Sequence, residues 1–221
     1  MQYPVYVFDA YGTLFDVHSA VGRLRARIGP QADRLSDLWR NKQLEYSWVR
    51  SLMGVYRNFE EITADALDFA ASRCGGISPD LRADLLDAYR VLDAYVDVRP
   101  ALEALRRKGA KTAVLSNGTP AMLADAVKAA GLADCLDAIL SVDALRTYKT
   151  APAVYQMACD HFGVGAQAIS FQSSNNWDIA GAKRFGFRPV WINRTGQPAE
   201  YVDCAPAAVL KSLDGIATVV D

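Results

Sequence analysis

The sequence has almost no net charge and no long apolar run. Its 221 residues carry 24 Lys and Arg against 25 Asp and Glu, which gives a formal net charge of -1. A basic stripe of the kind that binds nucleic-acid phosphates is therefore not expected. No stretch approaches the ~18 consecutive apolar residues of a transmembrane helix. We expect neither a nucleic-acid partner nor a membrane partner.

Histidines and paired cysteines are also scarce. The two histidines, His18 and His161, lie outside any motif, and no Gly-x-Ser-x-Gly elbow is present, which argues against a Ser-His-Asp hydrolase. The four cysteines are widely spaced without a Cys-x-x-Cys pair, so we predict reduced thiols and no zinc site. Because the N-terminus lacks a positively charged leader region and Asp9 interrupts its apolar run, the expected compartment is the cytoplasm.

Short apolar runs and helical segments alternate through the C-terminal half of the chain. Together with residues 5–8, four such runs are typical of buried parallel strands: 112–115, 138–142, 168–172 and 189–192. Helical spacing is present at 101–108, 120–130, 152–162, 177–185 and 206–213, before a last short run at 216–220. This order predicts an α/β fold with a doubly wound, Rossmann-like parallel sheet.

Between the first strand and the rest of this pattern, residues 17–95 have a different character. Strand-like runs are missing, and apolar residues recur at helical intervals, as at Leu44, Trp48 and Leu52. We therefore predict about four helices inserted after the first strand. The predicted division is an α/β core of residues 1–16 and 96–221 and a helical cap domain of residues 17–95.

Polar side chains collect where the predicted strands end. They belong to residues 9–13, 116–118 and 173–175 with Asp178, and Lys149 lies in the segment after a further strand. Taken singly, these residues are ordinary turn residues, helix caps or solvated side chains. In an open parallel sheet, however, the carboxyl ends of the strands form one crevice. Two carboxylates, a lysine and a hydroxyl-amide pair in one crevice favour a site for covalent catalysis.

These segments resemble the motifs of the haloacid dehalogenase superfamily. Residues 8–14, Phe-Asp-Ala-Tyr-Gly-Thr-Leu, resemble the first motif, and residues 115–118, Leu-Ser-Asn-Gly, resemble the second. Lys149 resembles the third, and residues 173–178, Ser-Ser-Asn-Asn-Trp-Asp, resemble the fourth. The resemblance extends over nearly the whole chain.

Two positions distinguish this chain from the magnesium-dependent phosphatases of the superfamily. The phosphatases carry a second Asp in the first motif and an acid pair in the fourth, where this chain has Tyr11 and Ser174. In the phosphatases that second Asp is the acid/base that protonates the leaving alcohol, and the acid pair of the fourth motif helps to hold magnesium, which prefers carboxylate ligands. Both changes therefore argue against phosphoryl transfer. Residues 38–48 and 51–54 also resemble the cap of the L-2-haloacid dehalogenases. The chain is therefore identified as a member of that type II family.

The resemblance implies a hydrolysis of short-chain L-2-haloalkanoic acids to D-2-hydroxy acids, without cofactor or metal. Asp9 would displace the halide with inversion at C2 and form a covalent ester, which water then cleaves. Lys149 and Thr13 would hold Asp9, and Asp178 would activate the water. The full catalytic set implied by the resemblance is Asp9, Thr13, Arg40, Lys149, Ser173, Asn175 and Asp178.

The resemblance also implies residues that bind the substrate and the departing halide. Arg40, Asn117 and the ring edge of Trp177 would bind the halide, because these groups are positive or carry N–H donors. Ser116 and Lys149 would bind the substrate carboxylate. The full binding set implied is Ala10, Tyr11, Arg40, Asn41, Leu44, Phe59, Ser116, Asn117, Tyr155 and Trp177. The implied partners are the haloacid, the halide and a second copy of the chain.

The chain departs from the family pattern at two places. Asn41 stands where the family usually has Gln, and Thr150 follows Lys149 where Pro is usual. Neither change removes a group that the chemistry needs, so we expect them to affect which haloacids are accepted more than the type of reaction. Two alternative functions are a magnesium-dependent phosphatase of the same superfamily and a catalytically idle binding protein with this fold.

Overall fold

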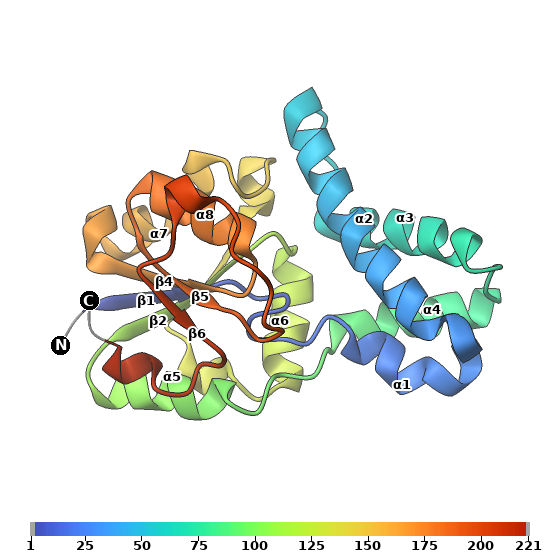
Figure 1. Cartoon of the computed structure of the whole chain (residues 1–221), viewed down its shortest axis with the longest axis horizontal. Coiled ribbons are helices and arrows are strands. Elements are labelled where there is room, and N and C mark those ends of the chain that lie inside the picture. The colour runs from blue at the N-terminus through green and yellow to red at the C-terminus, as the bar shows by residue number, and fades with distance from the viewer. Residues whose placement is uncertain (1–2, 220–221) are drawn as a thin grey trace.

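The computed structural model describes residues 3–219 and consists of a sheet domain beside a block of helices (Figure 1). Within that range the six strands are β1 Val5–Phe8, β2 Lys111–Ser116, β3 Ala138–Ser141, β4 Ile169–Ser173, β5 Arg188–Ile192 and β6 Ala208–Leu210. The eight α-helices of the same range are α1 Ser19–Ile28, α2 Ala32–Met53, α3 Phe59–Arg73, α4 Pro79–Arg90, α5 Val98–Arg107, α6 Pro120–Ala129, α7 Pro152–Phe162 and α8 Asn176–Phe185.

All pairings in the sheet are parallel, and the strand order is β3-β2-β1-β4-β5-β6. Helices α5 and α6 lie on one face of the sheet, while α7 and α8 lie on the other (Figure 1). This confirms the predicted doubly wound α/β fold. The order reverses between β1 and β4, which is where such sheets bind ligands. All four residues of β1 are buried, as expected for a strand covered on both faces.

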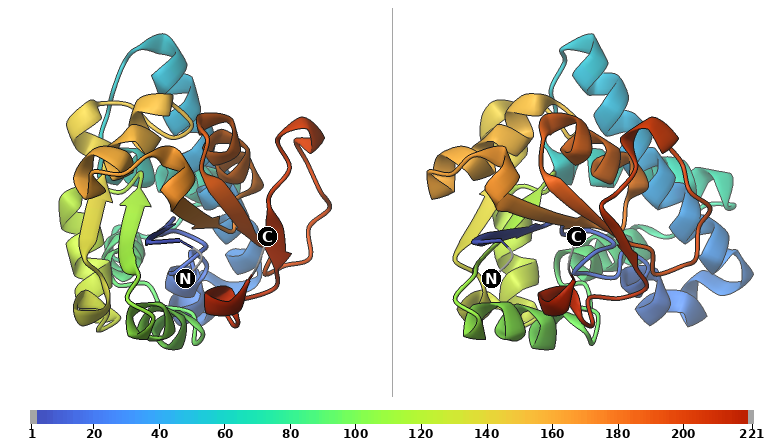
Figure 2. Two further views of the ribbon diagram at one scale, coloured as in Figure 1. Left: turned by 90° about the vertical axis from the view of Figure 1, so that its left-hand side faces the viewer. Right: turned by 60° about the vertical axis from the view of Figure 1, so that its left-hand side comes forward.

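The helical block consists of α1–α4, which all lie within residues 17–95. Several of its helices begin with local signals that the sequence provides. Asn58 and Glu61 form a reciprocal capping box at the start of α3, and Ser78 caps α4 ahead of Pro79. The end of α2 projects beyond the rest of the molecule (Figures 1 and 2). The assignment of this block as a separate domain stays a prediction.

Two connections join the helical block to the sheet and pair with each other. Phe15 forms an antiparallel bridge with Ala94, and the Tyr95 N–H donates to the Leu14 carbonyl over 3.0 Å. The N–H of Asp16 donates in the same way to Asp93 over 2.8 Å. The first connection follows the carboxyl end of β1 and Asp9, and its pairing with the second keeps both on that side of the sheet.

An ion pair beside the two paired connections links them to the sheet domain. Arg194, just after β5, donates to both oxygens of Asp97 over 2.9 and 3.1 Å and to the Thr13 carbonyl over 2.9 Å. Its guanidinium carbon lies 3.9 Å from the ring centroid of Tyr95. Asp97 also accepts from the N–H of Leu213 over 2.6 Å. These contacts join the segments that follow β5 and β6 to the two connections.

The predicted helix at residues 206–213 is wrong. The chain there forms β6, which pairs with β5 through Val190, Trp191 and Ile192. The apolar residues of this segment recur at helical intervals. Hydrogen bonding to β5, which would otherwise be the edge strand of the sheet, gives the segment a strand conformation instead. The final run predicted at 216–220 begins with a short 3₁₀ turn at Ile216–Thr218, and its last residue lies outside the described range.

None of the helices within residues 3–219 is both long and apolar enough to cross a membrane. The four thiols are free in the structure, with Cys135 and Cys159 buried and Cys74 and Cys204 partly buried.

Candidate active site

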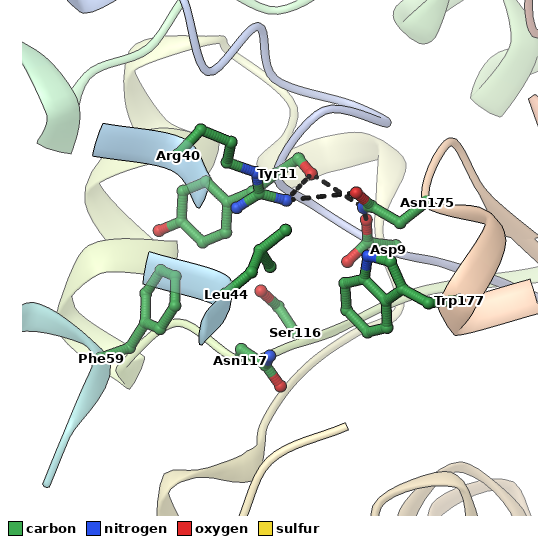
Figure 3. Close-up of a pocket in the computed structure, with 9 residues that line it drawn as sticks. All are labelled: Asp9, Tyr11, Arg40, Leu44, Phe59, Ser116, Asn117, Asn175 and Trp177. Carbon is green, nitrogen blue, oxygen red and sulfur yellow. Dashed lines mark hydrogen bonds between the residues drawn. The ribbon is translucent and has the colours of Figure 1, made fainter. Parts of the chain in front are cut away.

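The candidate active site is a small pocket at the carboxyl-terminal edge of the sheet, where the helical block faces it. The nine residues that line it are Asp9, Tyr11, Arg40, Leu44, Phe59, Ser116, Asn117, Asn175 and Trp177 (Figure 3). They come from the ends of β1 and β2, the start of α8, and helices α2 and α3. Its free space is about 10 Å³, room for about one water molecule.

Asp9 is positioned by its place after β1. Phe8 lies opposite Val114 of β2 and Gln172 of β4, so Asp9 comes next to the ends of both strands. Its N–H donates to the Gln172 carbonyl over 2.9 Å, and its side chain is nearly buried. The backbone is therefore fixed, and only the carboxylate has to be oriented.

The two oxygens of the Asp9 carboxylate have different surroundings. Oδ2 accepts from the Thr13 hydroxyl over 3.0 Å, from the Asn175 amide over 2.8 Å and, more distantly, from the Ser173 hydroxyl over 3.4 Å. Oδ1 accepts from Lys149 Nζ over 2.9 Å. Oδ2 is thus saturated with donors, whereas Oδ1 keeps lone-pair capacity for another atom.

Behind Asp9, the Lys149 ammonium lies between two carboxylates. Its Nζ donates to Asp178 over 2.8 Å as well as to Asp9. Asp178 is fully buried and accepts from the Tyr155 hydroxyl over 2.8 Å through its other oxygen. Removing a charge from this cluster would leave another one buried without its partner, which is strongly unfavourable.

The electrostatics of the cluster follow from its burial. Burial raises the pKa of Asp178 to about 6, although Lys149 and the Tyr155 hydroxyl act in the opposite direction. Burial alone would lower the pKa of Lys149, but Asp178 and Asp9 outweigh it and the pKa lies above its ordinary value. Lys149 therefore stays a cation at neutral pH, and Asp178 changes its charge in a range close to neutrality.

A divalent cation does not fit between these carboxylates. The magnesium site expected in a phosphatase of this fold would use the acids at the ends of β1 and β4. Here the Lys149 ammonium already occupies the space between Asp9 and Asp178, within 2.9 Å of each. Among the residues that the structure describes, no group of three or more His, Cys, Asp or Glu side chains is placed to hold a metal.

The helical block contributes one charged and two apolar side chains to the pocket. Arg40 and Leu44 lie one turn apart on α2, and Phe59 begins α3. The Arg40 guanidinium donates to the Tyr11 carbonyl over 3.2 Å and to Asn175 over 3.3 Å. Tyr11 packs against Phe59, with 5.6 Å between the ring centroids. The block thus closes the pocket over Asp9.

The opposite wall is formed by the end of β2 and the first turn of α8. The Asn117 side-chain oxygen accepts from the Lys149 backbone N–H over 3.1 Å. Its amide nitrogen is consequently turned toward the pocket, next to Ser116 (Figure 3). Trp177 lies across from these residues, beside Asp9 (Figure 3).

The structure does not bring every predicted residue to the pocket surface. Thr13, Lys149, Ser173, Asp178 and Tyr155 form the hydrogen-bonded layer behind it, and Ala10 is buried in the turn that follows β1. The placement of Asn41 in the pocket wall is wrong in this structure, because its side chain is exposed on α2. Successive helix residues point about 100° apart, so Arg40 and Asn41 cannot share one direction.

Two glycines that shape the site were missed by sequence reasoning. A Cβ at Gly118 would lie 2.9 Å from the Tyr11 ring and hydroxyl. One at Gly181 would lie 2.4 Å from the Tyr155 hydroxyl and 2.7 Å from the Thr150 methyl group. The available signal was their position, since Gly118 ends a motif and Gly181 interrupts a helix one turn after Asp178. Arg194 was also missed. It follows β5, and the end of that strand was not among the three strand ends predicted to form the crevice.

Comparisons with known proteins agree with this site. A family model described as haloacid dehalogenase-like hydrolase matches residues 3–186. The (S)-2-haloacid dehalogenase 1 of Pseudomonas sp. (strain CBS-3) is 50% identical over 196 residues, which are 88% of this chain and 86% of that protein.

Solved structures show the same relationship. A crystal structure of a dehalogenase has a TM-score of 0.95 and 46% identity, covering 97% of this chain and 95% of that one. The L-2-haloacid dehalogenase from Xanthobacter autotrophicus with chloropropionic acid covalently bound has a TM-score of 0.87 and 35% identity, covering 97% of each chain.

The fold and the matched model place the chain among the haloacid dehalogenase-like hydrolases. Within that class, it belongs to the family of the (S)-2-haloacid dehalogenases, hydrolases that act on carbon–halide bonds. The family resemblance on which the sequence analysis depended is thereby confirmed.

The contact at Gly181 leads to a stability prediction. We expect Gly181→Ala to lower the free energy of unfolding by about 1–3 kcal/mol, because the new methyl group collides with Tyr155 and Thr150. Gly22→Ala is the matched control, since Gly22 is an exposed residue of α1 with open space at its Cβ. That change should raise stability by about 0.5–1 kcal/mol. Urea unfolding measures both, and equal effects of the two changes would contradict the crowding at Gly181.

Proposed function

We propose that the protein hydrolyses short-chain L-2-haloalkanoic acids to D-2-hydroxy acids, through a covalent ester on Asp9. The observation that carries this proposal is the arrangement of the Asp9 carboxylate. Oδ2 is held by Thr13 and Asn175, whereas Oδ1 keeps lone-pair capacity beside Lys149 and the pocket. A carboxylate held in a fixed orientation beside a buried lysine, at the floor of a narrow pocket, is suited to nucleophilic attack.

In the first step, Asp9 Oδ1 attacks C2 of the substrate from the side opposite the halogen. The new C–O bond forms as the C–X bond breaks, and the electron pair leaves with the halide, which inverts C2. Arg40, Asn117 and the Trp177 ring edge, which line the pocket, receive the halide, because a leaving anion needs positive or N–H groups around it. The covalently bound chloropropionic acid in the Xanthobacter autotrophicus enzyme supports an ester intermediate.

Lys149 and Ser116 bind the substrate carboxylate in this proposal. Ser116 lines the pocket next to Asn117, and the positive charge of Lys149 lies directly behind Asp9. Tyr11, Leu44 and Phe59 supply an apolar surface for the short alkyl group. The carboxylate end of the substrate thus lies at Ser116, near the positive charge of Lys149, while its alkyl group faces the helical block.

In the second step, water attacks the carbonyl carbon of the Asp9 ester and gives up a proton. The bond between that carbon and the ester oxygen breaks, the departing alkoxide takes the second proton of the water, and Asp9 is restored as a carboxylate with one oxygen from the water. Asp178 accepts the proton of the water, since its raised pKa makes it a stronger base than an exposed carboxylate. Asn175 and Ser173, which contact Asp9 Oδ2, orient the water.

The two alternative functions have less support. In a phosphatase, the position of Tyr11 would carry the acid that protonates the leaving group. The Tyr11 hydroxyl is buried, and burial raises its pKa well above the ordinary value. A catalytically idle protein would have no need to keep the buried charges of Asp9, Lys149 and Asp178, which are costly to maintain.

Halide release from separate L- and D-2-chloropropionate tests the proposed reaction, with excess EDTA present. We expect chloride from the L isomer alone, with D-lactate as the product and no effect of EDTA. Asp9→Asn should lower the rate at least 10³-fold, because the nucleophile is lost. Loss of activity in EDTA, or equal activity in Asp9→Asn, would refute the mechanism. Phosphate release from esters with added magnesium would favour the phosphatase instead.

The role of Asp178 gives a pH prediction. A base with a pKa of about 6 is ionised above that pH, so the rate of ester hydrolysis should fall as the pH drops through 6. Tyr155→Phe removes a hydrogen bond that lowers the pKa of Asp178, so this acid limb should move to higher pH. Tyr201→Phe is the control, since Tyr201 is exposed and should leave the profile unchanged. An unmoved limb in Tyr155→Phe would exclude Asp178 as the titrating base.

We also infer that two copies of the chain associate, and we keep the cytoplasm as the expected compartment. Leu52, Met53 and Val55 are 88%, 58% and 53% exposed at the projecting end of α2, and an apolar surface of this kind favours association. Analytical ultracentrifugation should show a dimer for the wild type and a monomer for Leu52→Glu with Met53→Glu. Val202→Glu, a change at an exposed valine of the sheet domain, should remain dimeric. A monomeric wild type would overturn this inference.

A further inference from the structure

A tryptophan of α2 lies behind the pocket wall, in contact with a residue that lines the pocket. Arg40, Leu44 and Trp48 lie at four-residue intervals along α2 and therefore share one face of the helix. Arg40 and Leu44 reach the pocket itself. Trp48, one turn further on, contacts the pocket residue Trp177 instead.

The contact between the two indole rings is edge to face. Their centroids are 5.3 Å apart and their planes are inclined by 81°. This edge-to-face arrangement is a favourable geometry for an aromatic pair. Because Trp48 belongs to the helical block and Trp177 to α8, the contact joins the two parts of the molecule at the edge of the pocket.

The aromatic rings elsewhere in the pocket wall are more deeply buried than Trp48. Tyr11 and Phe59 are 3% and 1% exposed and pack against each other, whereas Trp48 is 36% exposed. The orientation of Trp177 consequently depends on a neighbour that is itself open to solvent on one side. The free space that these rings border is about 10 Å³, so the position of the Trp177 ring strongly affects the room left for a halide.

We propose that Trp48 is a positioning residue for halide binding. It holds the Trp177 ring so that the ring edge faces the pocket, and it closes the pocket on the solvent side. The inference rests on the proposed function, in which Trp177 receives the halide. It adds a residue from the helical block that acts on the halide through Trp177 and without touching it.

Halide affinity tests this role with Trp48→Ala, Trp48→Phe and the control Val49→Ala. Val49 is the next residue of α2, is 45% exposed and does not line the pocket. Two readouts apply: the inhibition constant of bromide during turnover at constant ionic strength, and the line broadening of chloride-35 by NMR, which needs no turnover. Trp48→Ala should raise the inhibition constant at least about 5-fold and reduce the broadening, as expected for the loss of one aromatic pair.

Trp48→Phe should stay within about 2-fold of the wild type, because it keeps an aromatic edge on Trp177, and Val49→Ala should do the same. An unchanged halide affinity in Trp48→Ala would overturn the inference, as would an equal loss in Val49→Ala. If the wild type released no halide from any haloacid, the proposed reaction would fail. A loss of chloride broadening confined to Trp48→Ala would still support the role of Trp48.

Discussion

A single buried cation between two carboxylates organises the active site. Lys149 is 2.9 Å from Asp9 and 2.8 Å from Asp178, and all three groups are withdrawn from water. One ammonium cannot neutralise two carboxylates, so the cluster retains negative charge that favours either protonation of Asp178 or attack by Asp9 on an electrophile. The donors on Asp9 Oδ2 leave Oδ1 of that carboxylate available, while Asp178 accepts one hydrogen bond on each of its oxygens.

The parallel sheet makes this cluster possible. Asp9 follows β1 and Ser173 ends β4, the two strands between which the strand order reverses, and Lys149 approaches from the segment after β3. The same edge carries both connections to the helical block, which are paired with each other and tied to Arg194 through Asp97 and the Thr13 carbonyl. Residues from the block therefore meet residues from the sheet at this edge, as in the contact of Arg40 with Asn175.

Much of the fold was predictable because each prediction depended on local patterns that the sheet then reinforced. Five of the six strands, the helical block and α5–α8 follow from apolar runs, helical spacing and the prolines and glycines at helix ends. β6 was not predictable, because three residues acquire strand geometry only by pairing with β5. Within the site, the types of residue were predicted, but their depth was not: Asp178 and Trp177 are neighbours in sequence, yet one is buried behind Lys149 and the other lines the pocket.

The sequence by itself determined the chemical groups and the edge of the sheet at which they meet, since residues that follow parallel strands must converge there. The tertiary structure decided which of them face the pocket. It exposed Asn41, placed Arg40 over Asp9, required glycine at positions 118 and 181, and set Trp48 against Trp177. The reason is physical: the direction of a side chain on a helix, and the room beside a backbone, depend on packing between segments that are distant in the chain.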